Sequence, residues 1–223
     1  MHWAIDCDDV IVNTNPSLHE YARTLYPEAR EDQMPVDRYA STWSIFSNQQ
    51  EFYDFIERWR KSDYFMNIKP IAASDECLRF LKYYGDTMGV LSGSGSDPSS
   101  RERRVEFLEH LGIASLFDYI VCIDPWESKA DMLEKMGAEA FVDDGVTYIH
   151  DSLSVPSMKL PMLFARPMNR EYVEAIRSGN YNIETFGPTG SRKIDLGAVA
   201  ERAKIENNWG QVVQERRTMG SVR

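Results

Sequence analysis

The sequence has few cysteines and no regular spacing among them. Cys7, Cys77 and Cys122 are the three in 223 residues, and no two form a C-x-x-C pair. This usage argues against a disulfide framework and against a cysteine zinc site, and it is typical of a reducing compartment. We therefore expect a cytoplasmic protein.

The sequence also lacks long hydrophobic runs and an excess of basic residues. No apolar run approaches the ~18 residues that span a bilayer, and the first residues reach the carboxylate of Asp6 too early for a secretion signal. Lys and Arg number 25 against 35 Asp and Glu, so the net charge is −10. Duplex nucleic acid and anionic membranes attract clustered cations, so neither is expected as a partner. Homo-oligomer formation stays open.

Hydrophobic residues make up 43% of the chain and charged residues 27%, which suits one α/β domain, with or without a small insertion. Short apolar runs alternate with amphipathic helical patterns, and this order predicts a parallel sheet with crossover helices. The predicted strands are His2–Ile5, Thr87–Leu91, Tyr119–Ile123, Ala140–Val142 and Leu160–Ala165.

Residues 14–67 break this alternation, because two helical patterns follow each other there without a strand between them. We interpret this interval as a helical cap inserted after the first strand, and residues 1–13 and 68–187 as the core domain. Residues 188–223 form a C-terminal tail with a helix-like stretch, Leu196–Val213, that could pack on the domain, mediate assembly or fray.

Chemically useful side chains follow four of the predicted strands. In chain order these are the acidic segment 6–10 (DCDDV), the turn 92–94 (SGS), Lys129, and the pair 143–144 (DD). Ligands and catalysts in open α/β sheets lie beyond the carboxyl ends of the strands. A lone D-x-D would be weak evidence, but the ordered set of four points to an active site.

This ordered set resembles the haloacid dehalogenase (HAD) superfamily of Mg²⁺-dependent phosphohydrolases. Its motifs are D-x-D-x-[VT], a Ser or Thr after a strand, a Lys and an acidic pair. The cap after the first motif, and the aromatic segment before a proline at Tyr64–Pro70, resemble the 5′(3′)-deoxyribonucleotidase family. The resemblance covers residues 4–145 and implies a Rossmann-like core with a small helical cap. Two departures are Asp9 in place of a glycine and Gly145 in place of an arginine.

The resemblance implies a role for each motif, and the chemistry agrees. Asp6 is expected to be the nucleophile that forms an aspartyl-phosphate, and Asp8 to protonate the leaving oxygen and then activate water. Ser92, with Ser94 as the alternative, would bind phosphoryl oxygens together with Gly93 and the neighbouring amides. Lys129 would oppose the developing charge; Lys135 is the alternative lysine.

Mg²⁺ is the cofactor that this resemblance implies. It prefers oxygen ligands and usually keeps several waters. Asp6, the backbone carbonyl of Asp8, and Asp143 or Asp144 would supply the protein ligands.

Substrate binding is expected from the cap. Tyr39, Trp43 and Phe46 would stack on a nucleobase, although at least one of them is expected in the core of the cap. Arg103 stands where the nucleotidases often carry a lysine, but the basic run 101–104 fits a solvated helix face as well.

The predicted function is therefore Mg²⁺-dependent hydrolysis of a small-molecule phosphate ester, a nucleoside 5′-monophosphate and preferably a deoxyribonucleotide. Two alternatives stay open for the substrate: another small phosphate ester or a polynucleotide 3′-phosphate. An alternative of another class is a non-catalytic HAD-like protein that binds nucleotides.

Overall fold

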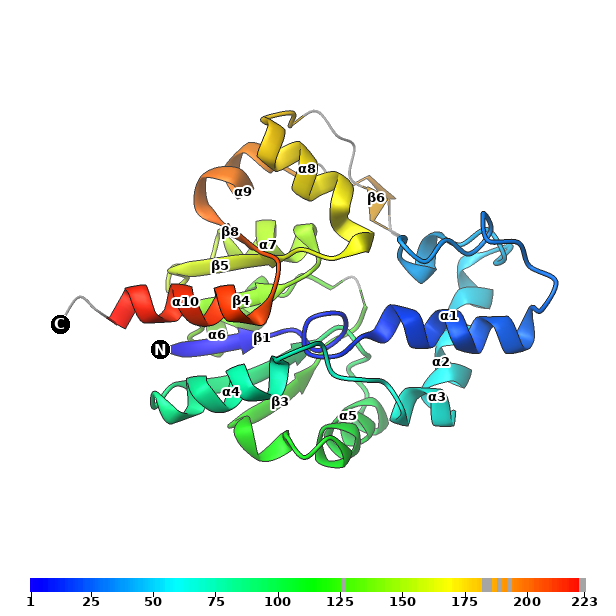
Figure 1. The fold of residues 1–223 in the computed structure, drawn as a ribbon, viewed down its shortest axis with the longest axis horizontal. Helices are drawn as coiled ribbons and strands as arrows, with labels where there is room; N and C mark the ends of the chain where they lie inside the picture. The colour runs from blue at the N-terminus through cyan, green and yellow to red at the C-terminus, as the bar shows by residue number, and fades with distance from the viewer. Residues whose placement is uncertain (126, 182–185, 188–189, 192–193, 221–223) are drawn as a thin grey trace.

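The computed structural model describes residues 1–125, 127–181, 186–187, 190–191 and 194–220. Its centre is a parallel sheet of six strands in the order β3-β2-β1-β4-β5-β8 (Figure 1). The predicted α/β class is thus confirmed, and each of the five predicted strands ends within one residue of its expected boundary. The strands are β1 (His2–Ile5), β2 (Thr87–Ser92), β3 (Tyr119–Cys122), β4 (Ala140–Asp143), β5 (Leu160–Phe164) and β8 (Lys204–Glu206). A separate two-stranded antiparallel sheet pairs β6 (Phe186–Gly187) with β7 (Gly190–Ser191).

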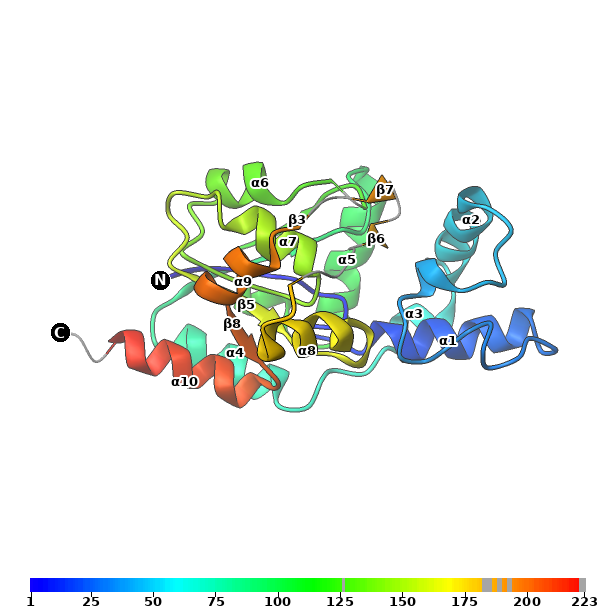
Figure 2. The ribbon, with the colours of Figure 1, turned by 90° about the horizontal axis from the view of Figure 1, so that it is seen from above.

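Helices cover both faces of the sheet, because its strands are apolar on both sides (Figure 2). In β1, Trp3 and Ile5 belong to one buried cluster and Ala4 to the other. The first cluster includes residues of α4 (Ser74–Tyr83), α5 (Pro98–His110) and α10 (Trp209–Gly220). The second includes residues of α6 (Ala130–Lys135), α7 (Val146–Ser152), α8 (Arg170–Ser178) and α9 (Leu196–Arg202). The short 3-10 helices η2 (Ala114–Leu116) and η3 (Pro167–Asn169) connect core elements.

The interval 14–67 forms a helical cap at one end of the molecule, beyond the carboxyl end of β1 (Figure 1). Two hydrogen bonds join the chain segments that enter and leave it, Asn13 N to Lys69 O at 2.9 Å and Ile71 N to Ile11 O at 2.8 Å. The two chain segments that connect the cap to the core therefore lie side by side. Its elements are α1 (Thr14–Leu25), η1 (Ala40–Thr42), α2 (Gln49–Arg60) and α3 (Asp63–Met66).

The C-terminal region differs from the single helix predicted over Leu196–Val213. It contains two helices, α9 and α10, separated by the strand β8, which pairs with β5 at the edge of the sheet. Two of the three residues in β8 are charged, so no apolar run marks it as a strand. Residues 194–220 pack on the domain, which is one of the three roles expected for this region. In the described part of the chain, no helix has both the length and the apolar character needed to cross a membrane.

Trp209 fastens α10 to the core. Its side chain is fully buried, its Nε1 donates a hydrogen bond of 2.9 Å to the carbonyl of Val10, and its ring centroid lies 6.0 Å from that of Phe164. The Val10 carbonyl belongs to the loop that carries the first acidic motif. The far end of the chain therefore supports the loop that shapes the site.

We expect Trp209→Ala to lower the free energy of unfolding by about 3–5 kcal/mol, because it leaves a large cavity and removes the partner of a buried carbonyl. Urea denaturation of the purified variant measures this loss. The matched control is Tyr83→Ala, since Tyr83 is 89% exposed and its loss should change stability by less than about 0.5 kcal/mol. Equal, small effects of the two variants would contradict the structural role given to α10.

Candidate active site

The predicted motifs meet at the carboxyl end of the central strands. β1 lies between β2 and β4, so Asp6 directly after β1 stands beside Ser92 and Asp143, the last residues of β2 and β4. The backbone N–H of Asp6 also donates to the carbonyl of Val142 at 2.9 Å. The strand order changes direction at β1, because β2 lies on one side of β1 and β4 on the other. Open parallel sheets bind ligands at the carboxyl ends of the strands where this change occurs.

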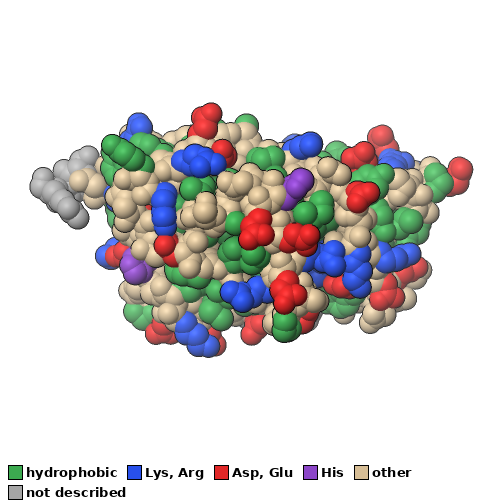
Figure 3. All heavy atoms as spheres, turned by 90° about the horizontal axis from the view of Figure 1, so that it is seen from below, with side chains coloured by type: hydrophobic (Ala, Val, Ile, Leu, Met, Phe, Trp, Pro, Cys, Tyr) green, Lys and Arg blue, Asp and Glu red, His purple; other side chains and the backbone are tan. Residues whose placement is uncertain are grey.

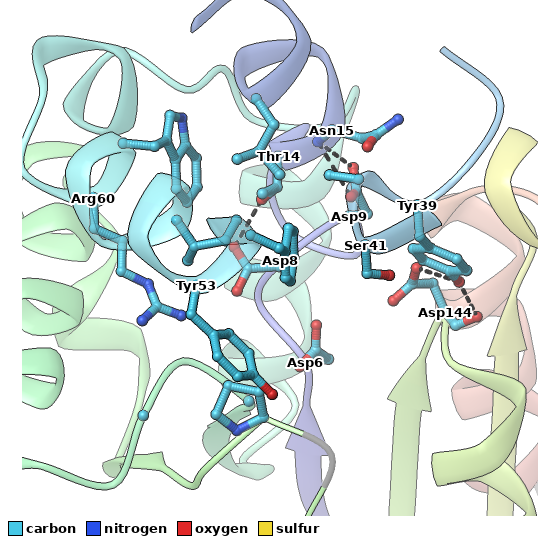
Figure 4. Close-up of a pocket in the computed structure, with 18 of the residues that line it drawn as sticks. Asp6, Asp8, Asp9, Thr14, Asn15, Tyr39, Ser41, Tyr53, Arg60 and Asp144 are labelled. Atoms are coloured by element: carbon cyan, nitrogen blue, oxygen red, sulfur yellow. Dashed lines mark hydrogen bonds between the residues drawn. The ribbon is translucent and has the colours of Figure 1, made fainter. Parts of the chain in front are cut away.

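A cavity of about 450 Å³ opens over this point, between the core and the cap. Its floor carries carboxylates from the core, and its opposite wall is formed by cap side chains that are largely apolar (Figure 4). The lining side chains from the cap helices α1 and α2 include Leu18, Phe52, Tyr53, Ile56 and Arg60.

Lys129 holds two of the carboxylates together. Its Nζ donates to Asp6 Oδ1 and to Asp143 Oδ2, both at 2.6 Å, and lies 4.4 Å from the centroid of the Tyr148 ring. Burial alone would lower the pKa of Lys129, but Asp143 and Asp6 raise it well above its usual value. Lys135, the alternative from the sequence, is exposed at the end of α6, so Lys129 is the lysine at this site.

Asp8 faces a different cation, Arg104, which the sequence analysis did not select. Arg104 Nη2 lies 2.5 Å from Asp8 Oδ2, and the hydroxyls of Thr14 and Ser92 donate to the same carboxylate at 2.7 and 3.2 Å. Burial raises the pKa of Asp8, but Arg104 and these hydrogen bonds outweigh it and hold the pKa below its usual value. Asp8 is therefore ionised at neutral pH.

The two candidate serines differ in their contacts. Ser92 is fully buried and its Oγ lies between Asp8 and Arg104, 3.2 Å from each. Ser94 is also buried, but its Oγ has no hydrogen-bond partner among the described residues. Gly93 lines the cavity, whereas Ser92 lies behind its surface, in contact with Asp8, which lines it.

Asp9 adopts a backbone conformation that favours glycine, with φ at +55°. Its carboxylate accepts from the backbone N–H of Asn15 at 3.2 Å, and Arg166 lies 3.9 Å away. Asp is among the residues that tolerate this region best. The turn thus accommodates the departure from the family's glycine.

Tyr39 connects the cap to the last acidic motif. Its hydroxyl donates to Asp144, 3.0 Å from Oδ2 and 3.2 Å from the backbone carbonyl (Figure 4). Burial, and the negative charge of Asp144, raise the pKa of Tyr39 well above its usual value, so the hydroxyl stays protonated. Tyr39 lines the cavity, but this contact makes it a link between cap and core.

Carboxylates outnumber cations in the site. Five carboxylates, those of Asp6, Asp8, Asp9, Asp143 and Asp144, face the four cations Lys129, Arg104, Arg60 and Arg166. Burial raises the pKa of Asp6 to about 7 although Lys129 opposes it, and burial also raises the pKa of Asp9 to about 7. The pKa values of Asp143 and Asp144 are raised by burial as well. The floor therefore needs additional positive charge.

The donor set fits Mg²⁺ in part. Three side chains of the His, Cys, Asp and Glu types do not converge anywhere in the described residues. Magnesium, however, commonly uses one or two carboxylates and completes its shell with water and substrate phosphate. Asp6 and Asp143, brought together by Lys129, supply two such oxygens, and the surplus of buried negative charge favours a bound cation.

Two expected aromatic substrate contacts, Trp43 and Phe46, lie outside the cavity. Trp43 is 3% exposed, donates through Nε1 to the Pro35 carbonyl at 3.1 Å and does not line the cavity. Phe46 packs on Phe52 and Phe55 and does not line it either. In this structure neither ring can stack on a ligand in the cavity, because both fill the core of the cap.

Arg103 also points away from the acidic floor. Its Nη1 donates to the backbone carbonyl of Arg60 at 2.9 Å, whereas the next residue, Arg104, is buried against Asp8. Helical spacing could have identified Arg104, because it lies three and four residues before the fully buried Phe107 and Leu108.

Gly145 has a steric reason to be glycine. A Cβ atom there would lie 2.6 Å from Tyr148 Cδ2 and 3.0 Å from Asp143 Oδ1. Its backbone N–H donates to that same Asp143 oxygen at 2.7 Å. The arginine common in the nucleotidases would therefore displace Tyr148, the ring that lies beside Lys129.

A parallel α/β core with a carboxylate–lysine cluster at the carboxyl ends of its strands, covered by an inserted cap, defines a class of hydrolases. The chain belongs to the haloacid dehalogenase-like hydrolase family, whose model matches residues 4–154. Enzymes of this superfamily generally use Mg²⁺. Among curated proteins, no sequence matches the chain.

Solved structures share the fold at low sequence identity. A predicted phosphatase from Clostridium acetobutylicum has 16% identity and a TM-score of 0.62, with 97% of this chain and 98% of that chain covered. A protein from Thermotoga maritima, proposed to be a beta-phosphoglucomutase, has 13% identity and a TM-score of 0.61, with 100% and 99% covered. A HAD family hydrolase from Deinococcus radiodurans, solved with bound phosphate and sodium, has 15% identity and a TM-score of 0.58, with 95% and 92% covered. None of the three is described as a nucleotidase.

We expect Arg104→Met to lower the free energy of unfolding by about 1–3 kcal/mol, because it removes the charged hydrogen-bond partner of the Asp8 carboxylate, whose side chain is 31% exposed. Chemical denaturation at neutral pH measures the change. Arg103→Met is the matched control: it removes the same type of side chain from the adjacent, partly exposed position, where we expect a loss of about 1 kcal/mol or less. If the two variants were equally stable, the ion pair with Asp8 would not have the importance given to it here.

Proposed function

We propose that this protein is a phosphatase that hydrolyses small phosphate monoesters through an aspartyl-phosphate. The observation that carries the proposal is the Asp6–Lys129–Asp143 cluster on the floor of a cavity that a separate cap closes. Fold similarity to phosphatases supports the reaction class but does not by itself assign it.

In this proposal Asp6 attacks the phosphorus atom while the ester oxygen leaves, so that one P–O bond forms as another breaks. The N–H groups and hydroxyl of the turn that begins at Ser92 orient the phosphoryl oxygens, and Lys129 stabilises the charge that develops on them. Mg²⁺ held by Asp6, the Asp8 carbonyl and Asp143 would supply the remaining positive charge that a phosphate dianion needs near these carboxylates.

In the proposed cycle Asp8 first protonates the leaving oxygen and then activates water. Its surroundings favour the second step, which needs the ionised carboxylate. Its pKa is held low by Arg104 and its hydrogen bonds in spite of burial, so the ionised form is ready to activate the water that hydrolyses the aspartyl-phosphate. To protonate the leaving oxygen first, Asp8 must gain a proton. The negative charge of a bound phosphate ester favours that proton, because a nearby like charge raises a carboxyl pKa.

Asp6→Asn should reduce turnover of para-nitrophenyl phosphate by several orders of magnitude, because the amide retains the shape of the side chain but cannot attack phosphorus. Steady-state kinetics measure turnover, and the thermal unfolding midpoint checks that the variant is folded. Retention of more than a few per cent of the activity by folded protein would refute the aspartyl-phosphate.

A chelator should abolish the phosphatase activity, and added Mg²⁺ should restore it, because the acidic floor repels a phosphate dianion. Phosphate release is measured after dialysis against the chelator and again after titration with Mg²⁺. Zn²⁺ serves as a comparison and should not restore full activity, since none of the described residues that line the cavity is Cys or His. Full activity of metal-free protein would contradict the proposed use of Asp6 and Asp143.

For the leaving group we propose a nucleoside, as in a nucleoside 5′-monophosphate. Leu18, Phe52, Tyr53 and Ile56 form an apolar wall opposite the acidic floor, and such a wall suits a flat base better than a small polar alcohol. Tyr53 is the ring we assign to base stacking, in place of the buried Trp43. It lines the cavity from α2, and its hydroxyl accepts a hydrogen bond of 2.8 Å from Gln49.

Tyr53→Ala should weaken kcat/KM for a nucleoside 5′-monophosphate by about 1–3 kcal/mol, the usual cost of losing base–aromatic stacking. Hydrolysis of glycerol phosphate, which has no base, should change little. Tyr53→Phe is the matched control and should retain most of the preference, because it keeps the ring. A wild-type enzyme that prefers sugar phosphates to every nucleotide would remove the nucleotide proposal and leave the phosphatase proposal intact.

A further inference from the structure

A second, smaller pocket lies where the cap meets the core, separate from the acidic floor. Its volume is about 60 Å³, room for a few water molecules or for one tetrahedral oxyanion. The end of α2 supplies Glu57, Arg60 and Lys61, and the segment that leads into α5 supplies Ser94. The first turns of α5 complete it with Ser99, Ser100, Arg103 and Arg104.

Positive charge dominates this pocket, although the chain as a whole has a net charge of −10. Arg60, Lys61, Arg103 and Arg104 line it, and Glu57 is its one acidic residue. Glu57 pairs with Arg60 at 2.9 Å and with Lys61 at 3.8 Å, so a single carboxylate serves two cations. Burial lowers the pKa of Arg60, and the neighbouring Arg104 lowers it further. Figure 3 shows Lys and Arg side chains gathered on this face towards the end that carries the cap.

Two buried donors at this pocket have no partner. Ser94 is 4% exposed and Arg104 is 2% exposed, and both line the pocket. Ser94 Oγ and Arg104 Nε are buried without a hydrogen bond among the described residues, while the two other nitrogens of Arg104 are bonded to Asp8, Ser92 and Cys7. Buried donors are nearly always satisfied in folded proteins, so each of these calls for an acceptor.

The geometry of the helices is compatible with an anion. The pocket includes Ser99 and Ser100 in the first turn of α5, a helix of 13 residues, where the helix dipole favours negative charge. The end of α2 would oppose an anion through its free carbonyls, but the carbonyl of Arg60 is already bonded to Arg103. The hydroxyls of Ser99 and Ser100 donate to the N-cap residue Asp97, so Ser94 and the cations remain as the donors.

We propose that this pocket binds a tetrahedral oxyanion, either free phosphate or a second anionic group of a bound ester. Such an anion contacts residues of the cap and of the core together and so holds the cap closed. The two pockets share Arg60 and Arg104 as a common wall. An anion in the small pocket therefore affects the position of two side chains that also line the cavity above Asp6.

Calorimetric titration of inorganic phosphate into the full chain, in metal-free buffer, tests the proposal without any catalysis. Under these conditions the acidic floor repels phosphate, so binding reports on the basic pocket. We expect wild-type protein to bind one phosphate per chain, and Lys61→Gln/Arg103→Gln to bind it about tenfold or more weakly. Ser94→Ala, which changes no charge, should also weaken binding. The matched control Lys135→Gln removes a cation from an exposed position on α6 and should bind as wild type does.

A kinetic arm distinguishes the two sources of the anion. If the ester carries it, the double variant raises KM for a nucleoside 3′,5′-bisphosphate far more than KM for the matching nucleoside 5′-monophosphate, which has no second anionic group. If the anion is free phosphate, the variant changes the two KM values alike. In that case the loss of phosphate binding in the titration is the result that supports the proposed anion site. The proposal is overturned if wild-type protein binds no phosphate in the metal-free titration and the double variant shows no selective loss with the bisphosphate.

Discussion

The contact on which the site depends is the buried Lys129 ammonium between Asp6 and Asp143. Two carboxylates at adjacent strand ends repel each other in a low-dielectric interior, and each would have to take up a proton without a cation nearby. Lys129 Nζ, 2.6 Å from both, allows them to remain close. The three residues come from different segments of the chain, so this contact also joins the ends of β1 and β4 to the loop after β3. The surplus of carboxylates that remains is what makes the floor suitable for a further cation.

The cap completes what the core begins. Core residues provide a charged floor common to many phosphate esters, while α2 provides the surface that a leaving group would touch. Contacts between the cap and the core include Tyr39 with Asp144, Arg103 with the end of α2, and Phe65 with Phe107. The basic pocket lies at the second of these contacts. An anion bound there would act on the same cap–core boundary that determines the shape of the cavity.

The expected substrate residues show how far a sequence pattern can be interpreted. The sequence pattern favours Trp43 and Phe46 as base-stacking rings, yet both pack against the core of the cap, and Tyr53 on the helix α2 lines the cavity. Arg103 was considered and Arg104 was not, although a rotation of about 100° per residue separates the two on the helix. Helical spacing relative to Phe107 and Leu108 places Arg104 on the buried side of the helix, but that this side meets Asp8 depends on how the helix docks.

The sequence by itself predicted the α/β class and five of the six strands of the sheet, and it placed the candidate residues Asp6, Asp8, Ser92, Lys129 and Asp143 after those strands, with Ser94, Lys135 and Asp144 as alternatives. These follow from local periodicity and from the rule that ligands lie at the carboxyl ends of parallel strands. Only the tertiary structure decided that Arg104 faces Asp8, that β8 completes the sheet and that Trp209 supports the loop after Val10. Those contacts join residues far apart in the chain. They depend on packing between elements, and a pattern within one element contains no information about its neighbour.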